Sequence, residues 1–475
     1  MEEYLKLWGY CREAFARESS WERAVRLSTG MLLCLGRHTV TGLITTTGGH
    51  ARDWSADYRV FERERFDAGR MFSVVRRETV DRLEAEQPVV TFMDDTLLKR
   101  RGQKVSGTSW HRDANGPKFC CNFVWAGRYL QISGALPEED RPGSCRGIPF
   151  LLKHCPIPKR PSKRAPDCEW DEYWKLRDSS RISVKGAEAI CNLREGLDNE
   201  SMGGRQLVVS VDGGYTNSSV VRALPERTTL IGRIRKDAKL YARPEDDEPV
   251  RRGRKRFYGR QLPTPEDIRQ GDEEPWQDVE AFSVDRTHTF RLKVMRNIRS
   301  KIAGERNLCL VIIQPLRYRL TKKSRLLYRN PAYLICTDPE LDVSRILQWY
   351  LWRWQIEVNF RDQKSLLGMD ESSVRTAKSV EKFPELTALS YAFLQLASTA
   401  PGVTASFSGH LPKWRGQTEP GRMSTGMMIT EMRNAVWGLA VNGKNLGHFV
   451  NRRSATAKLL KFRPSLETAV LYAHR

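Results

Sequence analysis

The chain has 475 residues, and this length predicts two to four domains rather than one simple core. A formal charge of +22 and an isoelectric point near 9.7 favour a polyanionic partner, with nucleic acid first because basic residues recur along the whole chain. The sequence has no apolar run long enough for a membrane span and no signal-peptide pattern at its start, so we expect a cytoplasmic protein with no membrane partner.

The ten cysteines form no CxxC pair, which is typical of reduced core residues rather than disulfides. Cys145, His154, Cys155 and Cys168 lie close in the sequence, but their spacing matches no usual zinc finger or ribbon. We therefore expect no zinc site there.

Residues 1–85 are predicted to form a helical N-terminal DNA-binding domain, because their apolar residues recur at helical spacing. Residues 33–44 contain a Gly–polar break between two apolar stretches, as a helix-turn-helix does. A plain helical bundle that positions the next domain explains the same pattern, and both interpretations stay open. In the first, the groove-facing residues are Arg37, His38, Thr39 and Thr41.

From residue 88 the apolar pattern changes to a period of two, which predicts strands. The first strand covers 88–96, and two more, 119–125 and 128–136, are joined by an expected hairpin turn at Ala126-Gly127. Residues 137–175 contain many prolines and basic residues, so we expect a surface loop.

A second group of elements follows, ordered helix, strand, helix, strand. They are predicted at 183–197, 207–211, 216–224 and 229–235. Between 237 and about 330 the chain becomes charged and then strand-like again, which indicates a β-rich insertion of its own. Its predicted strands are 279–284, 290–294, 308–313 and 332–336.

A long helix is predicted from Asp342, a good N-cap, to Gly368, a good helix stop. Its polar residues at offsets 0, 3, 7 and 14 fall within an arc of roughly 60° on an α-helix. They are Tyr350, Arg353, Glu357 and Lys364. An ordinary amphipathic helix with an i,i+4 ion pair would give the same pattern, so this face alone decides nothing.

Three acids from distant places complete the pattern. Asp95 and Asp212 each end an apolar strand, and Glu357 lies on the helix face. If they converge, their repulsion is about 4 kcal/mol per close pair at an effective dielectric of 20, which divalent cations would remove. Oxygen-only ligands suit two Mg²⁺ or Mn²⁺ ions. Asp94 stays open as an alternative to Asp95, because strand ends often bulge.

The motif Tyr350-x2-Arg353-x3-Glu357-x6-Lys364 resembles the signature of one subgroup of the DDE transposases of bacterial insertion sequences. Asp95 followed by a threonine is similar to the family's first catalytic acid, and Asp212 is similar to its second. The resemblance covers roughly residues 88–400, and 33–60 also resembles N-terminal regions of relatives.

This resemblance implies an α/β fold: an RNase H-like core, split by a β-rich insertion and flanked by helical regions. The implied divisions are 1–85, core 86–236, insertion 237–336, core 337–400 with the catalytic Glu helix, and a helical C-terminal region 401–475. It also implies Mg²⁺-dependent cleavage at terminal inverted repeats and strand transfer into target DNA, within a dimer on double-stranded DNA. Tyr350, Arg353 and Lys364 would then bind phosphates.

Basic clusters along the chain are candidate phosphate contacts, although a charge run is usually a solvated face. Arg233 and Arg235, which follow the strand after Asp212, are the better candidates because they are near the predicted site. The other clusters are 99–104, 159–164, 251–256, 322–323 and 452–453. Two alternatives to a transposase remain: a structure-selective nuclease on the same fold, and a catalytically inactive DNA-binding derivative.

Overall fold

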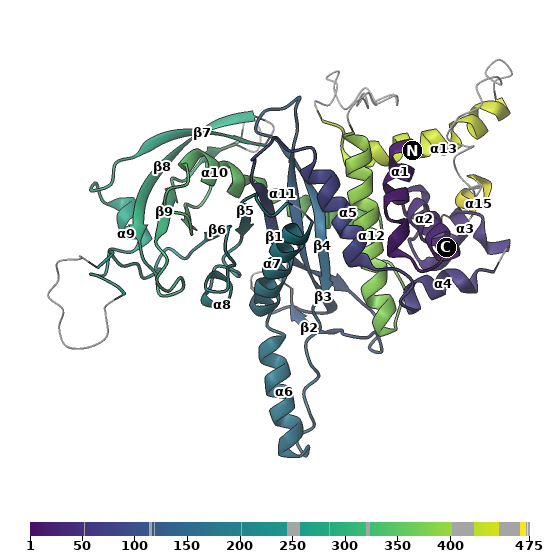
Figure 1. The fold of residues 1–475 in the computed structure, drawn as a ribbon, viewed down its shortest axis with the longest axis horizontal. Helices are drawn as coiled ribbons and strands as arrows, with labels where there is room; N and C mark the ends of the chain where they lie inside the picture. Colours follow the sequence, from purple (N-terminus) through teal and green to yellow (C-terminus); the bar gives the residue numbers. More distant parts are fainter. Residues whose placement is uncertain are drawn as a thin grey trace.

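A ten-stranded mixed sheet runs through the middle of the molecule (Figure 1). The strand order is β2-β3-β1-β5-β6-β12-β9-β8-β7, and β4 also pairs with β3. The computed structural model describes residues 1–51, 53–113, 116–117, 119–200, 202–244, 257–284, 286–319, 324–400, 422–445, 466–471 and 473. Across these ranges, none of the helices has the length and apolar character that a membrane crossing requires.

The strands of the large sheet are β1 (Val89–Lys99), β2 (Ser109–Arg112), β3 (Phe123–Pro137), β4 (Cys145–His154), β5 (Leu207–Val211), β6 (Thr228–Arg233), β7 (Gln277–Ser283), β8 (Arg286–Ile298), β9 (Leu308–Ile313) and β12 (Ala332–Cys336). A separate two-stranded sheet consists of β10 (Arg317–Tyr318) and β11 (Leu327–Tyr328).

The helices before the sheet are α1 (Glu2–Tyr10), α2 (Glu18–Leu33), α3 (Val40–Thr46), α4 (Ser55–Glu62) and α5 (Ala68–Val80), with 3₁₀ turns η1 (Arg12–Ala14) and η2 (Gly49–Ala51). Those within or after it are α6 (Asp167–Ser179), α7 (Ile182–Asn199), α8 (Ser218–Val221), α9 (Pro265–Gln270), α10 (Val343–Trp352), α11 (Trp354–Ser365), α12 (Ala377–Ser398), α13 (Thr425–Asn445) and α15 (Leu466–Leu471).

Strands β1, β3 and β4 form an antiparallel meander, whereas β5 and β6 extend the sheet parallel to β1. All five residues of β5 are buried. A continuous apolar run of this kind is what a parallel strand needs when both faces of the sheet are covered. The predicted strand 207–211 is therefore confirmed.

The predicted hairpin at Ala126-Gly127 is wrong, because both residues lie inside β3. Ala126 pairs with Lys99 on one side and with Ser109 on the other, so the strand passes through without turning. The predicted loop 137–175 is also partly wrong, since it contains β4 and α6. Helix α6 escaped prediction because it buries no residue and thus shows no apolar periodicity.

The strands predicted between 237 and 336 are present as β7, β8, β9 and β12, but they do not form a sheet of their own. Leu334, Ile335 and Cys336 of β12 pair with β6, so the insertion continues the central sheet. Strand β12 thereby covers the edge of β6 that β5 leaves open. The division of the chain at 237 and 336 stays a prediction.

Asp342 caps α10, as predicted, by accepting hydrogen bonds from the backbone N–H groups of Ser344 and Arg345. The single long helix predicted from this point is, however, two helices, because α10 ends and α11 begins around Arg353. The face that carries Tyr350 and Glu357 therefore spans a helix break.

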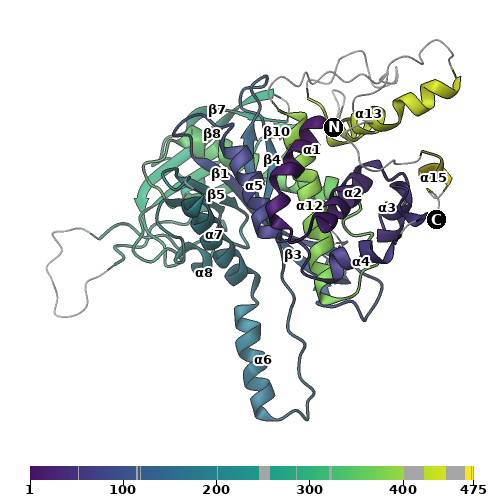
Figure 2. The same cartoon turned by 45° about the vertical axis from the view of Figure 1, so that its right-hand side comes forward.

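The N-terminal helices pack around α12, whose residues are buried along almost its whole length. At the other end lie β7, β8 and β9, and α6 projects away from the body in both views (Figures 1 and 2). Residues 401–421 and 446–465 of the predicted C-terminal region fall outside the described residues, as do the basic runs 251–256, 322–323 and 452–453.

Candidate active site

Two acids lie side by side, one in the middle of β1 and the other directly after β5. These strands are parallel, and Phe92 pairs with Ser210 and Met93 with Val211. The next residue on each strand is an acid, Asp94 and Asp212. Residues at the same register of neighbouring parallel strands point to the same face, and the strands are about 4.8 Å apart. The two carboxylates are therefore neighbours.

The same face carries the helix with the third acid. Ser210 donates a hydrogen bond of 3.1 Å to the carbonyl of Trp349 in α10. Phe92 is buried in one apolar cluster with Ile346 of α10 and Ile356 of α11. Because side chains alternate along a strand, Asp94 follows Phe92 onto this face. Glu357, one residue after Ile356, lies at its rim.

Arg353 connects two of the three acids. Its Nη1 lies 3.3 Å from Oδ2 of Asp94, and its Nη2 lies 3.1 Å from Oε1 of Glu357. The guanidinium carbon also lies 5.9 Å from the centre of the Tyr350 ring. A single cation at the helix break thus holds carboxylates from a strand and from a helix more than 250 positions apart.

The acids on this face repel one another. Burial and then the charge of Asp212 raise the pKa of Asp94 to about 7, although the backbone N–H of Asp95 and the Arg353 guanidinium act in the opposite direction. A bound cation would relieve this repulsion, because it favours the charged form of the carboxyl groups around it.

The donor set fits a hard divalent ion, since it offers carboxylate oxygens alone from Asp94, Asp212 and Glu357. As arranged here, no three histidine, cysteine or acidic side chains among the described residues form a ready metal site. The Arg353 guanidinium lies between the first and third acids, and it would have to withdraw before both could bind the same ion.

Asp95, the acid predicted for this cluster, points to the opposite face. Its Oδ1 accepts a hydrogen bond of 2.6 Å from the Tyr215 hydroxyl, and its Oδ2 accepts one of 2.6 Å from Nε of Arg128. The register between β1 and β3 is unbroken from Thr91 to Lys99, so no bulge brings Asp95 round. The structure thus places Asp94, and not Asp95, beside Asp212 and Glu357.

Tyr215 and Arg128 are the partners that the sequence interpretation missed. One available signal was the end of the mainly apolar run in each strand, because Asp94 directly follows the run that ends at Met93 and Asp212 the run that ends at Val211. Counting the acids from that residue selects Asp94. Choosing the acid next to the threonine selected its neighbour instead.

Lys364 lies on the acid face but is already bound to the chain. Its Nζ donates to Oγ1 of Thr96 at 2.7 Å and to the carbonyl of Leu97 at 3.0 Å. Burial lowers its pKa. Lys364 therefore ties the end of α11 to β1, and its third N–H remains for another acceptor.

A cleft of about 1160 Å³ begins next to Asp212, at Gly213 and Thr216. Arg233 is exposed in its wall, and Arg235, whose side chain is 85% exposed, pairs with Asp237. The cleft lies between the end of β6 and the strands that extend the sheet. Its other cationic lining residues are Lys236, Lys239, Arg269 and Lys301.

The residues proposed for a groove-binding helix at the N-terminus do not share one exposed side. His38 is buried and hydrogen-bonds Glu371 and the carbonyl of Met31. Thr39 caps α3 by accepting from the backbone N–H of Gly42. Arg37 and Thr41 are exposed. The packing interpretation therefore describes His38 and Thr39 better than the DNA-reading one.

Two family models match parts of the chain. One, described as "DDE superfamily endonuclease", matches residues 12–124, and the other, described as "Transposase DDE domain", matches residues 183–393. No curated protein matches the chain.

The first range contains Asp94 and Asp95, and the second contains Asp212 and Glu357, so both matches fall on the acid cluster. The site and the matches together support a nuclease-type enzyme. More particularly, they support assignment to the DDE-type transposases. This family acts on DNA and generally uses divalent metal ions.

Proposed function

We propose that this protein is a transposase that cleaves DNA at the terminal inverted repeats of a mobile element and transfers the strand into target DNA. The observation that carries the proposal is the acid cluster: Asp94 and Asp212 at one register of parallel strands, and Glu357 joined to Asp94 through Arg353. We take the meander of β1, β3 and β4 with parallel β5 and β6 as an RNase H-like core, which suits this chemistry.

Asp94, Asp212 and Glu357 would hold two divalent ions, with Mg²⁺ or Mn²⁺ suited to the oxygen donors. When bound, such a pair activates a water or a 3′-hydroxyl and stabilises the leaving oxygen. We assign Asp94 in place of Asp95, because Asp95 is fully occupied by Tyr215 and Arg128.

The remaining residues bind and orient the DNA backbone. Arg353, once released from the acids, turns its planar donors toward a phosphate. Tyr350, Arg233 and the free N–H of Lys364 border the same face, and the cationic cleft carries the backbone onward past Arg235. We further propose that two copies act together on the paired ends, at the nucleoid.

The test uses DNA that flanks the gene, labelled at one end, with a supercoiled plasmid as target. Wild-type protein should cut the end and join it to the plasmid when Mg²⁺ is present. Glu357→Gln and Asp94→Asn should abolish both steps while leaving DNA binding intact. Unchanged cleavage by either variant would refute the assignment of that acid, and Asp95→Asn serves as the neighbouring control.

A second candidate is a DNA nuclease without strand transfer. The match of residues 12–124 to the model described as "DDE superfamily endonuclease" favours it. Its acids and metals would be the same. The joining step of the assay separates the two, because a nuclease cuts the labelled end and leaves the plasmid unlabelled.

A further inference from the structure

A group of aromatic rings stands exposed on the β2–β3 hairpin. Trp110 and Phe123 are 63% and 61% exposed. Trp110 lies directly opposite Trp125, with ring centres 5.5 Å apart and the ring planes inclined at 67°. We call Trp110, Phe123 and Trp125 the aromatic platform. Large exposed rings gathered at one place on a surface usually mark a binding site.

The platform is rigid, because each ring comes from a paired strand. Trp125 pairs opposite Trp110 and Phe123 opposite Arg112. The indole N–H of Trp125 donates to the carbonyl of Gly102 at 3.2 Å, which fixes its ring against the loop after β1. A ligand would therefore meet preformed rings and would not have to order them.

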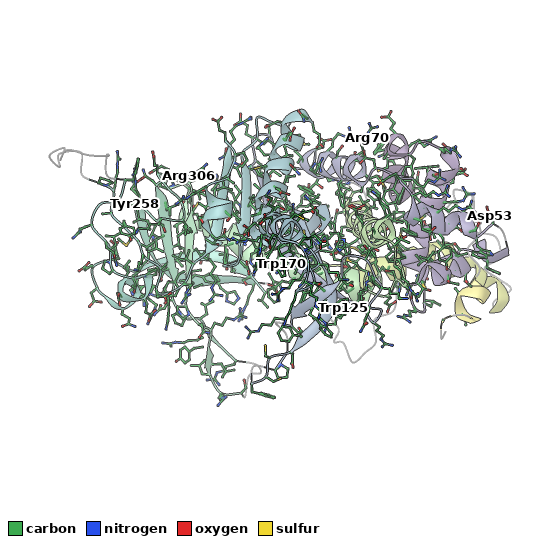
Figure 3. The ribbon with its side chains drawn as sticks, turned by 90° about the horizontal axis from the view of Figure 1, so that it is seen from below. Asp53, Arg70, Trp125, Trp170, Tyr258 and Arg306 are labelled. Atoms are coloured by element: carbon green, nitrogen blue, oxygen red, sulfur yellow. The ribbon has the colours of Figure 1, made fainter. Side chains whose placement is uncertain are left out.

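The platform faces the same way as the acid cluster. Asp94 pairs with Gln131 of β3, and side chains alternate along the strand, so residues 131, 129, 127, 125 and 123 share one face. Trp125 lies six positions from Gln131, or about 20 Å at 3.4 Å per residue. That span corresponds to about six nucleotide steps of a stacked strand. Figure 3 labels Trp125 at this end of the sheet.

The charges around the platform are positive. Arg101, Lys104 and Arg112 are exposed, and none of them has a salt bridge to another described residue. The nearby acid, Asp113, pairs with Lys99. A second exposed aromatic group lies on α6, at Trp170, Tyr173 and Trp174, but its helix also carries acidic residues such as Asp167, Glu169, Asp171 and Glu172. Arg160 and Arg177 lie over two of the α6 rings, at 5.3 Å from Trp170 and 4.9 Å from Trp174, so the charge around that group is mixed. Around the platform, the cations outnumber the nearby acid, and that acid is already paired.

From these observations we infer that the aromatic platform binds unpaired nucleotides of DNA, by stacking bases on Trp110 and Phe123 while Arg101, Lys104 and Arg112 contact the phosphates. Rings and cations together are how proteins hold single strands, since every base has a face to stack and every nucleotide a phosphate. Paired bases of an intact duplex present no free face, so the platform distinguishes unpaired from paired DNA. This inference deepens the proposed function and rests on it.

The test compares a blunt duplex with the same duplex carrying a six-nucleotide single-stranded extension, by fluorescence anisotropy in Ca²⁺ without Mg²⁺. Wild-type protein should bind the extended duplex more tightly. Trp110→Ala should weaken that binding about tenfold and leave blunt-duplex binding and Mg²⁺-dependent cleavage of a blunt duplex unchanged. Trp110→Phe should keep most of the preference, because it keeps a ring.

Trp174→Ala is the matched control, since it removes an exposed tryptophan, 46% exposed, from the acidic helix. It should bind both DNAs as wild type does. Arg112→Ala should weaken binding to both DNAs alike and reduce the salt dependence of binding by about one phosphate contact. Phe123→Ala provides a second ring variant if Trp110→Ala melts earlier than wild type.

Equal binding of the two DNAs by wild-type protein, or an unchanged preference in both ring variants, would overturn the inference while leaving the proposed function standing. If Trp110→Ala instead alters self-association in sedimentation and not DNA binding, the platform is a protein interface and the inference fails. Protein that neither binds nor cuts any DNA would reject the proposed function as well.

Discussion

The two adjacent aspartates, Asp94 and Asp95, lie in opposite environments on the two faces of the sheet. On one face, Asp95 has a partner for each oxygen, and Tyr215 and Arg128 satisfy it within the chain. On the other, Asp94 shares Arg353 with Glu357 and lies beside Asp212, and burial with that neighbouring charge raises its pKa to about 7.

The difference shows what separates a structural acid from a metal-binding candidate. A carboxylate that the chain neutralises fully contributes to stability and has no capacity left for an external ion. A cluster with three carboxylates around one arginine carries an excess of negative charge that folding alone leaves unresolved. Such a cluster is stable only at a cost, which a bound cation removes.

The largest expected effect comes from removing the charge of Asp94. Asp94→Asn should reduce Mg²⁺-dependent cleavage by about a thousandfold, because an ion that loses one of its anionic ligands loses several kcal/mol of transition-state stabilisation. The measurement is the single-turnover rate of cutting at saturating Mg²⁺. Asp95→Asn should stay within about tenfold of wild type. If Asp95→Asn were the inactive variant, the comparison of the two faces would be reversed.

The variants Asp94→Asn and Asp95→Asn should change the free energy of unfolding in opposite directions. Asp95→Asn removes the charge that pairs with Arg128, and its side chain is 14% exposed, so we expect a loss of about 2 kcal/mol after allowing for partial solvent screening. Asp94→Asn should raise metal-free stability at pH 8, because its folded pKa lies above its usual value and its charge is therefore unfavourable. Urea unfolding with and without Mg²⁺ measures both. Losses of equal size would contradict the distinction.

Much of this site could be predicted from sequence, because its parts are local. The helix face with Tyr350, Arg353 and Glu357 follows from spacing, and β5 follows from an apolar run that ends in Asp212. What failed depends on pairing. The course of β3 through Ala126-Gly127 is set by its neighbours on both sides, which a single strand's sequence does not contain.

The way the strands after residue 237 join the central sheet, and the helix break, could not be predicted for a related reason. Strand β12 joins the core because β6 offers an edge in space. The paired residues Cys336 and Ile231 are 105 residues apart in the sequence, so proximity along the chain gives no guide. The break at Arg353 accompanies the contacts of that side chain with Asp94 and Glu357, which are again tertiary. Local patterns thus gave the elements, and long-range pairing decided which acid faces the site.

The pH must be fixed when the two aspartate variants are compared, because Glu385 in α12 titrates in the same range. Burial raises its pKa to about 7, with Glu381 adding to the shift and Lys382 opposing it. A folded pKa above the unfolded one means that the folded state takes up the proton, so stability is full below about pH 4.5 and falls as the pH rises to about 7.

Glu385→Gln should remove that loss. We expect the variant to match wild type near pH 4.5 and to be more stable by about 1–2 kcal/mol at pH 8. Urea unfolding at pH 4.5, 6 and 8 checks this, and Glu381→Gln, a neighbour on the same helix, is the control. Parallel stability curves for wild type and Glu385→Gln would show that Glu385 is not the group that titrates, and the remaining slope would then belong to Asp94.

The smallest effect concerns Lys364, which lies on the acid face yet is bound by the chain as Asp95 is. Lys364→Met and Thr96→Val each break the 2.7 Å hydrogen bond between these side chains, and each should cost about 1 kcal/mol of stability. If the third N–H of Lys364 also contacts a phosphate, Lys364→Met alone should lower the salt dependence of DNA binding by about one contact. Thr96→Val keeps the cation and should leave that dependence unchanged. Identical salt dependence in the two variants would make Lys364 a purely structural residue. The acid face would then carry a charge that the chain uses itself, Lys364, beside charges that remain available for an external ligand.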